Sequence, residues 1–230
     1  MLLALDTSAA VSAAVLDDDE GSVDVLAERT RHDPRRHAEL LVPSIDEVLR
    51  EAGRTRADVS RIGVGVGPGP FTGLRVGLVT ARTLGLALGV PVDGVCSLDA
   101  LALQALEALE DGEHELVVAT DARRREVYWA RYAARPVGGV PVRLRGPEVS
   151  RPADVPVGGA VCVGRGGVLY PDALPTPEQE GLPLDPQAGA LGRVAAVRLR
   201  AGGEGLEPPD PMYLRRPDAA PPAERKRVLQ

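Results

Sequence analysis

Small residues recur every four positions between residues 73 and 89, within a segment that otherwise reads as an apolar helix. The repeated positions are Gly73, Gly77, Ala81, Gly85 and Gly89. At 1.5 Å per helical residue they form a narrow stripe about 25 Å long. Each helical glycine costs about 1 kcal/mol relative to alanine, and close approach of another backbone would offset that cost. Because the rest of the helix is apolar nearly all round, we expect it to be covered on both sides, by its own sheet and by either another part of the chain or a partner's helix.

Around this helix, the first hundred residues alternate between short strands and helices. Apolar or alternating runs predict strands, and apolar residues at helical spacing predict helices. The predicted order is strands at 2–6, 11–16 and 22–28, a helix that begins between 33 and 37 and ends at 52, a strand at 61–66, a helix at 73–88, a strand at 90–95 and a helix at 97–110. Three antiparallel strands followed by alternating helices and strands is the order of the ribonuclease-H-like half-domain of actin-like ATPases and sugar kinases.

The second half of the chain begins in a similar way. Strands at 115–121 and 126–132 are joined by a short polar turn, and beyond residue 136 glycine and proline dominate. The clear elements that remain are short strands near 141–144 and 160–164 and a helix at 187–200. We therefore expect an α/β protein with two ribonuclease-H-like, actin-like lobes, the second a degenerate copy of the first.

This reading divides the chain into three parts. The expected parts are a first lobe at 1–98, a reduced second lobe at 99–203 and a partly disordered C-terminal tail at 204–230. Within the tail, 204–211 and 217–230 read as poorly ordered, with 212–215 docked between them.

Composition narrows the classes of function. The net charge is -6 and aromatic residues make up 3% of the chain, which argues against a large autonomous nucleic-acid-binding surface. The N-terminus lacks the pattern of a signal peptide, and no stretch approaches 18 uncharged apolar residues. We expect a cytoplasmic protein that does not contact membranes.

One turn and one loop carry residues that hold phosphate in other proteins. Asp6, Thr7 and Ser8 end the first strand, where hydroxyls and backbone N–H groups hold phosphate and a carboxylate orients a Mg²⁺-bound water in nucleotide-binding versions of this fold. The same residues are also common in plain turns. Gly67 and Gly69 precede the glycine-rich helix, but the prolines that follow them remove N–H donors, so a phosphate cradle there is the less favoured interpretation.

The search for catalytic and metal-binding residues finds none. His32 and His37 are five residues apart and cannot share a helix face as ligands, and His114 stands alone. Cys96 and Cys162 match no zinc or redox spacing and are expected to be reduced thiols. The run Arg123–Arg125, with Arg131 and Arg135, either contacts phosphate or forms a solvated hairpin face, the second being favoured.

The motifs together resemble one family. The residues that carry the resemblance are Asp6-Thr7-Ser8, His37–Ile45, Gly67–Gly77, Asp121–Tyr128 and Tyr213–Arg215. In order and over nearly the whole chain, these segments look like the bacterial TsaB (YeaZ) family, and the block Phe71-Thr72-Gly73-Leu74-Arg75 is the most specific. Pro70 departs from the pattern, which usually has serine there.

The resemblance implies a function and a set of partners. It implies a non-catalytic subunit that activates a TsaD-like paralogue, together with a TsaE-like ATPase, in threonylcarbamoyl transfer to the adenosine beside the anticodon of tRNAs that read ANN codons. It implies a homodimer when the chain is alone, contact with tRNA only through the complex, and no cofactor of its own, although ATP or ADP can bind at the complex interface. The implied interface comprises Leu40, Leu41, Ile45 and Val48 of the first helix and Gly73, Leu74, Gly77, Leu78, Ala81 and Gly85 of the second.

Two other functions remain open from the sequence. The turn Asp6-Thr7-Ser8 permits an autonomous ATPase of the actin-like fold, which would turn over ATP in isolation. An inactive glycoprotease-like homologue is the other alternative, although the sequence offers no metal ligands for a protease.

Overall fold

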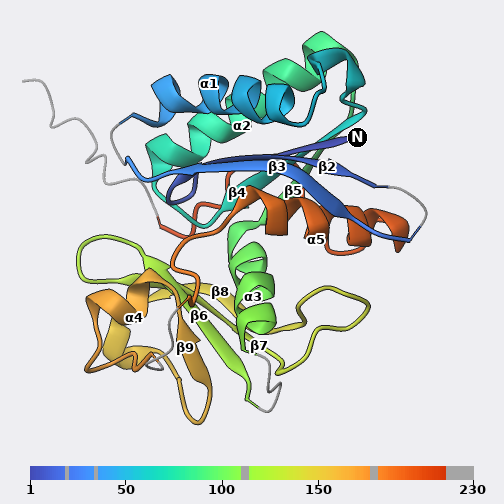
Figure 1. The fold of residues 1–230 in the computed structure, drawn as a ribbon. Helices are drawn as coiled ribbons and strands as arrows, with labels where there is room; N and C mark the ends of the chain where they lie inside the picture. The colour runs from blue at the N-terminus through green and yellow to red at the C-terminus, as the bar shows by residue number, and fades with distance from the viewer. Residues whose placement is uncertain (19–20, 34–35, 110–113, 177–180, 216–230) are drawn as a thin grey trace, which may run out of the picture.

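The computed structural model describes residues 1–18, 21–33, 36–109, 114–176 and 181–215, which form two lobes, each built on a mixed sheet (Figure 1). The first sheet has the order β3-β2-β1-β4-β5. β2 runs antiparallel to β1 and β3, whereas β4 and β5 run parallel to β1. The strands are β1 (Leu2–Asp6), β2 (Val11–Asp17), β3 (Asp24–Arg31), β4 (Arg61–Gly67) and β5 (Val92–Cys96). This order confirms the predicted ribonuclease-H-like α/β class.

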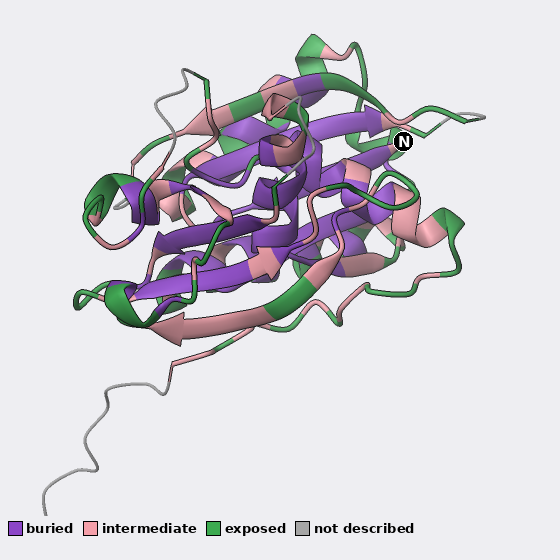
Figure 2. Ribbon diagram, turned by 90° about the horizontal axis from the view of Figure 1, so that it is seen from below, coloured by how far each residue is buried: buried purple, intermediate pink, exposed green. Residues whose placement is uncertain are grey.

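Helices cover both faces of the first sheet. α1 (His37–Glu51) and α2 (Phe71–Leu88) lie on one face and α5 (Ala188–Arg200) on the other (Figure 1). The alternation of β1 explains this arrangement, since Leu3 and Leu5 pack with α1 and α2 while Leu2 and Ala4 pack with α5. β1, β2 and β4 are almost wholly buried, whereas the edge strand β3 is largely exposed or intermediate (Figure 2).

The second sheet repeats the first in reduced form. Its order is β8-β7-β6-β9, with β6 antiparallel to β7 and parallel to β9. α3 (Ser97–Ala108) covers one face, and α4 (Arg165–Leu169) contacts β6 and β9. The strands are β6 (Leu116–Asp121), β7 (Val127–Tyr132), β8 (Arg143–Ser150) and β9 (Val161–Val163), and two short 3₁₀ helices, η1 (Arg56–Asp58) and η2 (Pro152–Asp154), complete the described elements. The reduced copy expected from the sequence is confirmed.

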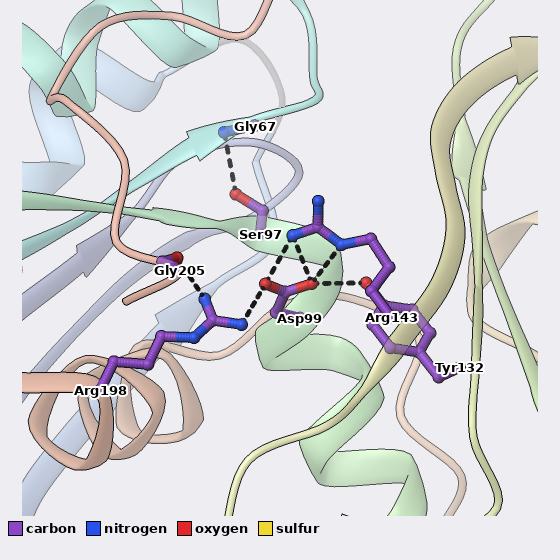
Figure 3. Close-up of polar contacts among 7 residues, drawn as sticks. All are labelled: Gly67, Ser97, Asp99, Tyr132, Arg143, Arg198 and Gly205. Carbon is purple, nitrogen blue, oxygen red and sulfur yellow. Dashed lines mark hydrogen bonds and ion pairs between the residues drawn. The ribbon is translucent and has the colours of Figure 1, made fainter. Parts of the chain in front are cut away.

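A buried carboxylate joins the lobes (Figure 3). Asp99, in the first turn of α3, is 0% exposed, and its Oδ1 accepts hydrogen bonds from Tyr132 Oη at 2.7 Å and Arg143 Nη2 at 2.8 Å. Its Oδ2 accepts from Arg198 Nη2 at 2.8 Å. Burial raises the pKa of the Tyr132 hydroxyl well above its ordinary value, so Tyr132 acts as a donor. Because Arg198 lies on α5 and Arg143 on β8, one side chain ties both sheets together.

The C-terminal part of the chain returns to the first lobe. α5 lies inside the range 99–203 but packs on the first sheet, and the division at residues 98 and 203 itself stays a prediction. The expectation that 204–211 is poorly ordered is wrong, because the backbone of Glu207 pairs with Gly94 of β5 and so covers the free edge of that strand. The docking of 212–215 is confirmed by the bond from Met212 N to Val66 O at 2.8 Å. Residues 216–230 of the predicted tail lie outside the described part.

Two smaller expectations concern thiols and membranes. Cys96 and Cys162 are buried and free, and burial raises the pKa of each thiol to about 12. In the described part of the chain, no helix has both the length and the apolar character that crossing a bilayer requires.

Candidate functional site

The turn predicted to hold phosphate is closed by its own side chains. Asp6 is 0% exposed; its Oδ1 accepts from Ser8 N at 2.8 Å and Ser8 Oγ at 2.6 Å, and its Oδ2 accepts from Ser97 Oγ at 2.5 Å. Burial is the main cause that raises the pKa of Asp6 above its ordinary value of 3.8. In this arrangement both carboxylate oxygens are satisfied within the protein, so Asp6 does not face a ligand.

The glycine loop packs directly on that turn. Gly67 N donates to Ser97 Oγ at 3.2 Å, and a Cβ built at Gly69 would lie 2.7 Å from the carbonyl oxygen of Ser8. The structure therefore brings the five candidate phosphate residues together, Asp6, Thr7, Ser8, Gly67 and Gly69, but as a tight intramolecular junction. Their role in binding phosphate stays a prediction that this geometry does not favour.

Thr7 explains the small residues of α2. Its Oγ1 donates to Gly73 O at 2.8 Å and accepts from Gly77 N at 3.1 Å, so the hydroxyl is inserted into the backbone of the helix. A Cβ at Gly77 would collide with that hydroxyl, and one at Gly85 would collide with Val92. At these glycines the close approach that the stripe requires is thus supplied within the chain, which is one of the two alternatives that the sequence leaves open, and the contact of this helix with a partner stays a prediction.

The same burial changes the interface predicted from the sequence. Of its ten residues, all but Leu40 are buried in the first lobe. The buried residues are Leu41, Ile45 and Val48 of α1 and Gly73, Leu74, Gly77, Leu78, Ala81 and Gly85 of α2. These side chains form the core between the helices and the sheet, so any partner must contact other residues of α1 and α2.

The opposite side of α2 exposes large apolar side chains. Val79 and Leu86, two helical turns apart, are 61% and 87% exposed, and Phe71 lies at the start of the same helix. On α1, Val42 is also exposed. A shallow groove of about 460 Å³ runs beside Val79, lined also by Ala38, Phe71 and Val76. Apolar side chains that are clustered on a protein surface mark contact sites for other proteins, whereas single scattered ones need no explanation.

An aromatic cluster lies at the N-terminal end of this face. The rings of Phe71 and Tyr213 stack with centroids 5.1 Å apart, and the Arg75 guanidinium lies 3.8 Å from the centroid of Phe71. Arg75 Nε also donates to Tyr213 Oη at 3.1 Å. The C-terminal segment thus fixes two side chains of α2 in one arrangement. No local pattern in the sequence indicates the partner of Phe71, because Tyr213 lies 142 residues further along the chain.

A cleft of about 620 Å³ separates the lobes. Its first-lobe wall includes Ser8–Ala10 and the start of α2 at Thr72, and its second-lobe wall includes Asp121, Arg123 and Arg165. Arg165 pairs with Asp185, whose Oδ2 also lies 3.2 Å from His32 Nδ1. The charged groups of the cleft are therefore largely paired with one another.

The turn between β6 and β7 has an unusual backbone conformation, because three successive residues other than glycine have positive φ angles. Arg123, Arg124 and Arg125 have φ values of 63°, 53° and 62°, a region that costs residues other than glycine about 1–2 kcal/mol each. Asp121 Oδ1 accepts from Arg123 N at 2.8 Å and holds the turn. All three side chains are exposed.

Metal ligands were also predicted to be absent. Among the described residues, no three His, Cys, Asp or Glu side chains are grouped closely enough to hold a metal ion. His37 instead forms a hydrogen bond between its Nε2 and Ala9 O, at 3.1 Å. The residues that sequence reasoning missed are Asp99, Arg143 and Arg198; the available signal was an aspartate in the first turn of an apolar helix.

Known proteins resemble this chain over most of its length. The family model for TsaD, tRNA N6-adenosine threonylcarbamoyltransferase, matches residues 24–154. An uncharacterised protein of Mycobacterium tuberculosis is 43% identical over 96% of this chain and 94% of its own length. The tRNA threonylcarbamoyladenosine biosynthesis protein TsaB of Escherichia coli is 30% identical over 93% of this chain and 94% of its own length. The structure of YeaZ from Pseudomonas aeruginosa is 34% identical, with a TM-score of 0.75 over 93% of this chain and 99% of that one.

Fold and site define a two-lobed ribonuclease-H-like protein in which the turn after the first strand is closed and a helix pair exposes apolar side chains. The sequence identities and the coverage given above assign the chain to a family within this class. The chain belongs to the TsaB (YeaZ) family, and the resemblance drawn from its motifs is confirmed.

Proposed function

We propose that this chain is a non-catalytic subunit that binds and activates a TsaD-like catalytic relative. Family membership supports a role in the biosynthesis of threonylcarbamoyladenosine in tRNA, the process named for the Escherichia coli relative. The closed turn at Asp6 supports a role other than that of an autonomous ATPase, because its carboxylate is fully engaged by Ser8 and Ser97. The reaction itself is then threonylcarbamoyl transfer by the partner to the adenosine beside the anticodon of ANN-reading tRNAs.

The observation that carries the proposal is the exposed apolar face of α2. Val79 and Leu86, two helical turns apart, are exposed on α2, and Val42 is exposed on α1, which packs against α2 on the same face of the sheet (Figure 1). The other side of α2 is filled by Thr7 and the sheet, so the exposed face is the part left for a partner. A typical specific interface buries roughly 800 Å² per partner, which two adjacent helices can supply.

The assembly that we propose has further members. A TsaE-like ATPase joins the pair in the cytoplasm, and ATP or ADP binds at the complex interface. When the catalytic relative is absent, two copies of this chain pair through the same helices. The catalytic relative and the second copy cannot bind at the same time, because each would bury the same apolar side chains.

The interface is tested with two charges on the exposed face. Val79→Glu with Leu86→Glu is expected to reduce co-purification with the catalytic relative at least tenfold, because each carboxylate would have to be desolvated at the contact. A matched control is Val137→Glu with Leu144→Glu, which changes two apolar residues of the second lobe that are 68% and 51% exposed. Thermal unfolding is expected to be unchanged in both variants. Equal co-purification of both variants with the relative would show that α2 is not the interface.

The activating role is tested by reconstitution. Purified catalytic relative and TsaE-like ATPase are incubated with tRNA in the presence or absence of this chain, and threonylcarbamoyladenosine is measured by mass spectrometry. Modification is expected only when the chain is present and to fall with Val79→Glu and Leu86→Glu. Full modification without the chain would overturn the proposal.

A further inference from the structure

One end of the second sheet carries a concentration of arginine that the proposed interface on α2 does not use. Six arginines lie there, in a chain whose net charge is -6. They are Arg123, Arg124, Arg125, Arg151, Arg165 and Arg215. The set comes from four separate segments of the chain, so a single charged loop does not account for it.

Strand pairing places these segments together. Asp121 of β6 pairs with Val127 of β7, and Val127 pairs with Ser150 at the end of β8, so Arg151 follows directly beside the turn 122–126. β9 runs parallel to β6, which brings Arg165 to the same end. The C-terminal segment arrives there too.

Arg215 fixes that segment to the turn. Its Nη1 donates to Ala122 O at 3.0 Å, and its Nη2 lies 2.7 Å from Glu126 Oε2.

The charges at this end do not cancel. Three carboxylates at this end are paired, Asp121 with Arg123, Glu126 with Arg215 and Asp185 with Arg165. Two more lie nearby, Asp33 in the cleft that Arg123 and Arg165 line and Asp154 in η2. In the described part of the chain, no carboxylate lies within ion-pair distance of Arg125 or Arg151, and both side chains are exposed. This region is therefore positive although the whole chain is acidic.

The backbone of the turn gives an independent reason to expect a ligand. Three successive arginines have positive φ, where glycine is sterically preferred, and the turn is held by Glu126 N donating to Arg123 O at 3.0 Å. Glycine at these positions would fold with less strain, so the fold itself does not require the arginine side chains. Strained residues of this kind concentrate at functional sites.

We propose that this arginine surface, the turn 122–126 with Arg151 and Arg215, binds the phosphodiester backbone of RNA. The planar guanidinium matches phosphate oxygens in a bidentate geometry, and side chains spread over several segments suit successive phosphates better than one small anion. The recognition is independent of base sequence, because phosphate contacts position a nucleic acid without reading it. The inference rests on the proposed function in one respect, since the RNA held in the complex is the tRNA substrate.

The test uses the full chain and a fluorescently labelled anticodon stem-loop hairpin. Arg125→Glu with Arg151→Glu is compared with a control variant, Arg50→Glu with Arg54→Glu. Arg50 lies in the last turn of α1 and Arg54 follows the helix; both are exposed, and the control changes the net charge equally. At about 50 mM salt we expect the first variant to bind at least tenfold more weakly than the parent and the control to stay within about twofold. The slope of log affinity against log salt should become shallower by about 2 in the first variant only.

Several outcomes would overturn the inference. The parent chain failing to bind the hairpin at low salt would do so, as would an equal loss in both variants, which would indicate a general effect of charge. Displacement of the hairpin by stoichiometric magnesium ATP would identify a nucleotide site instead. Co-purification with the catalytic relative is measured on the same variants. It is expected to be unchanged by Arg125→Glu and Arg151→Glu, whereas failure of the proposed function appears in the α2 variants.

Discussion

Two aspartates, Asp6 and Asp99, are each 0% exposed, and the protein accommodates them in opposite ways. Asp6 lies at the end of β1 and accepts hydrogen bonds from the hydroxyls of Ser8 and Ser97. Asp99 lies at the start of α3 and is bound by two guanidinium groups. Burial disfavours the charged form of Asp6 and raises the pKa of its carboxyl, although the hydrogen bonds from Ser8 and Ser97 oppose that shift. Asp99 instead forms buried ion pairs with Arg143 and Arg198.

The two aspartates therefore have different structural roles, one in a turn and the other between the lobes. At Asp6 the surroundings are uncharged donors, and the residue closes a turn that faces the inter-lobe cleft. At Asp99 the ion pairs join α3, β8 and α5, so they hold the two sheets in a fixed relation (Figure 3). The buried ion pairs of Asp99 thus lie at the junction between the lobes, whereas Asp6 is held by hydroxyl groups. Three substitutions test this contrast.

The largest effect is expected at Asp99. Asp99→Ala leaves Arg143 and Arg198 without their carboxylate, and removing one partner of a buried ion pair costs about 3–5 kcal/mol of unfolding free energy. For a chain of this size the melting temperature should fall by roughly 6–20 °C. Asp93→Ala is the control, because the Asp93–Arg61 pair is partly exposed and such pairs contribute about 1 kcal/mol or less. Equal losses in the two variants, measured by thermal unfolding, would contradict the contrast.

A smaller effect is expected at Ser97, which links the two regions. Its hydroxyl donates to Asp6 and accepts from Gly67 N, so Ser97→Ala leaves one buried donor and one buried acceptor unpaired. The expected cost is about 1–3 kcal/mol in denaturant unfolding. Ser22→Ala removes an exposed hydroxyl bonded to Asp24 and should change stability by less than about 0.5 kcal/mol. A loss at Ser97 no larger than this control would show that the closed turn contributes little.

The smallest effect, and the one that depends on pH, is expected at Asp6. Because its folded-state pKa is raised, the folded chain keeps a proton over a range in which the unfolded chain has lost it. The contribution of Asp6 to stability is therefore greatest below pH 3.8 and declines as the pH rises through the folded-state pKa.

Asp6→Asn keeps the shape of the side chain but cannot ionise. It should change the unfolding free energy by about 1 kcal/mol or less at neutral pH, since the amide oxygen still accepts from Ser8. Relative to the parent, the variant should gain stability as the pH is raised from about 4, because only the parent acquires a buried charge. Urea unfolding at a series of pH values measures this difference. A constant difference between the two proteins across that range would contradict the raised pKa.

The sequence by itself determined the elements of the first lobe. The apolar run of β1 and the helical spacing of Leu41, Ile45 and Val48 are local patterns, and the spacing also states which face of α1 is buried. The small-residue stripe of α2 was equally clear in the sequence, but the sequence does not show which group packs against it. Gly77 requires close contact with something, and the sequence does not distinguish a partner's backbone from the Thr7 hydroxyl.

Only the tertiary structure decided the contacts between distant segments. Asp99 meets Arg198 from 99 residues away, Tyr213 stacks on Phe71, and Arg215 reaches the β6–β7 turn. Such pairs leave no periodic signal, because each depends on where separate elements end in space. For Asp99 the physical reason is the large free-energy cost of burying an unpaired charge. The sequence shows that an aspartate lies in an apolar helix and therefore needs a partner, but it does not show which arginine supplies the positive charge.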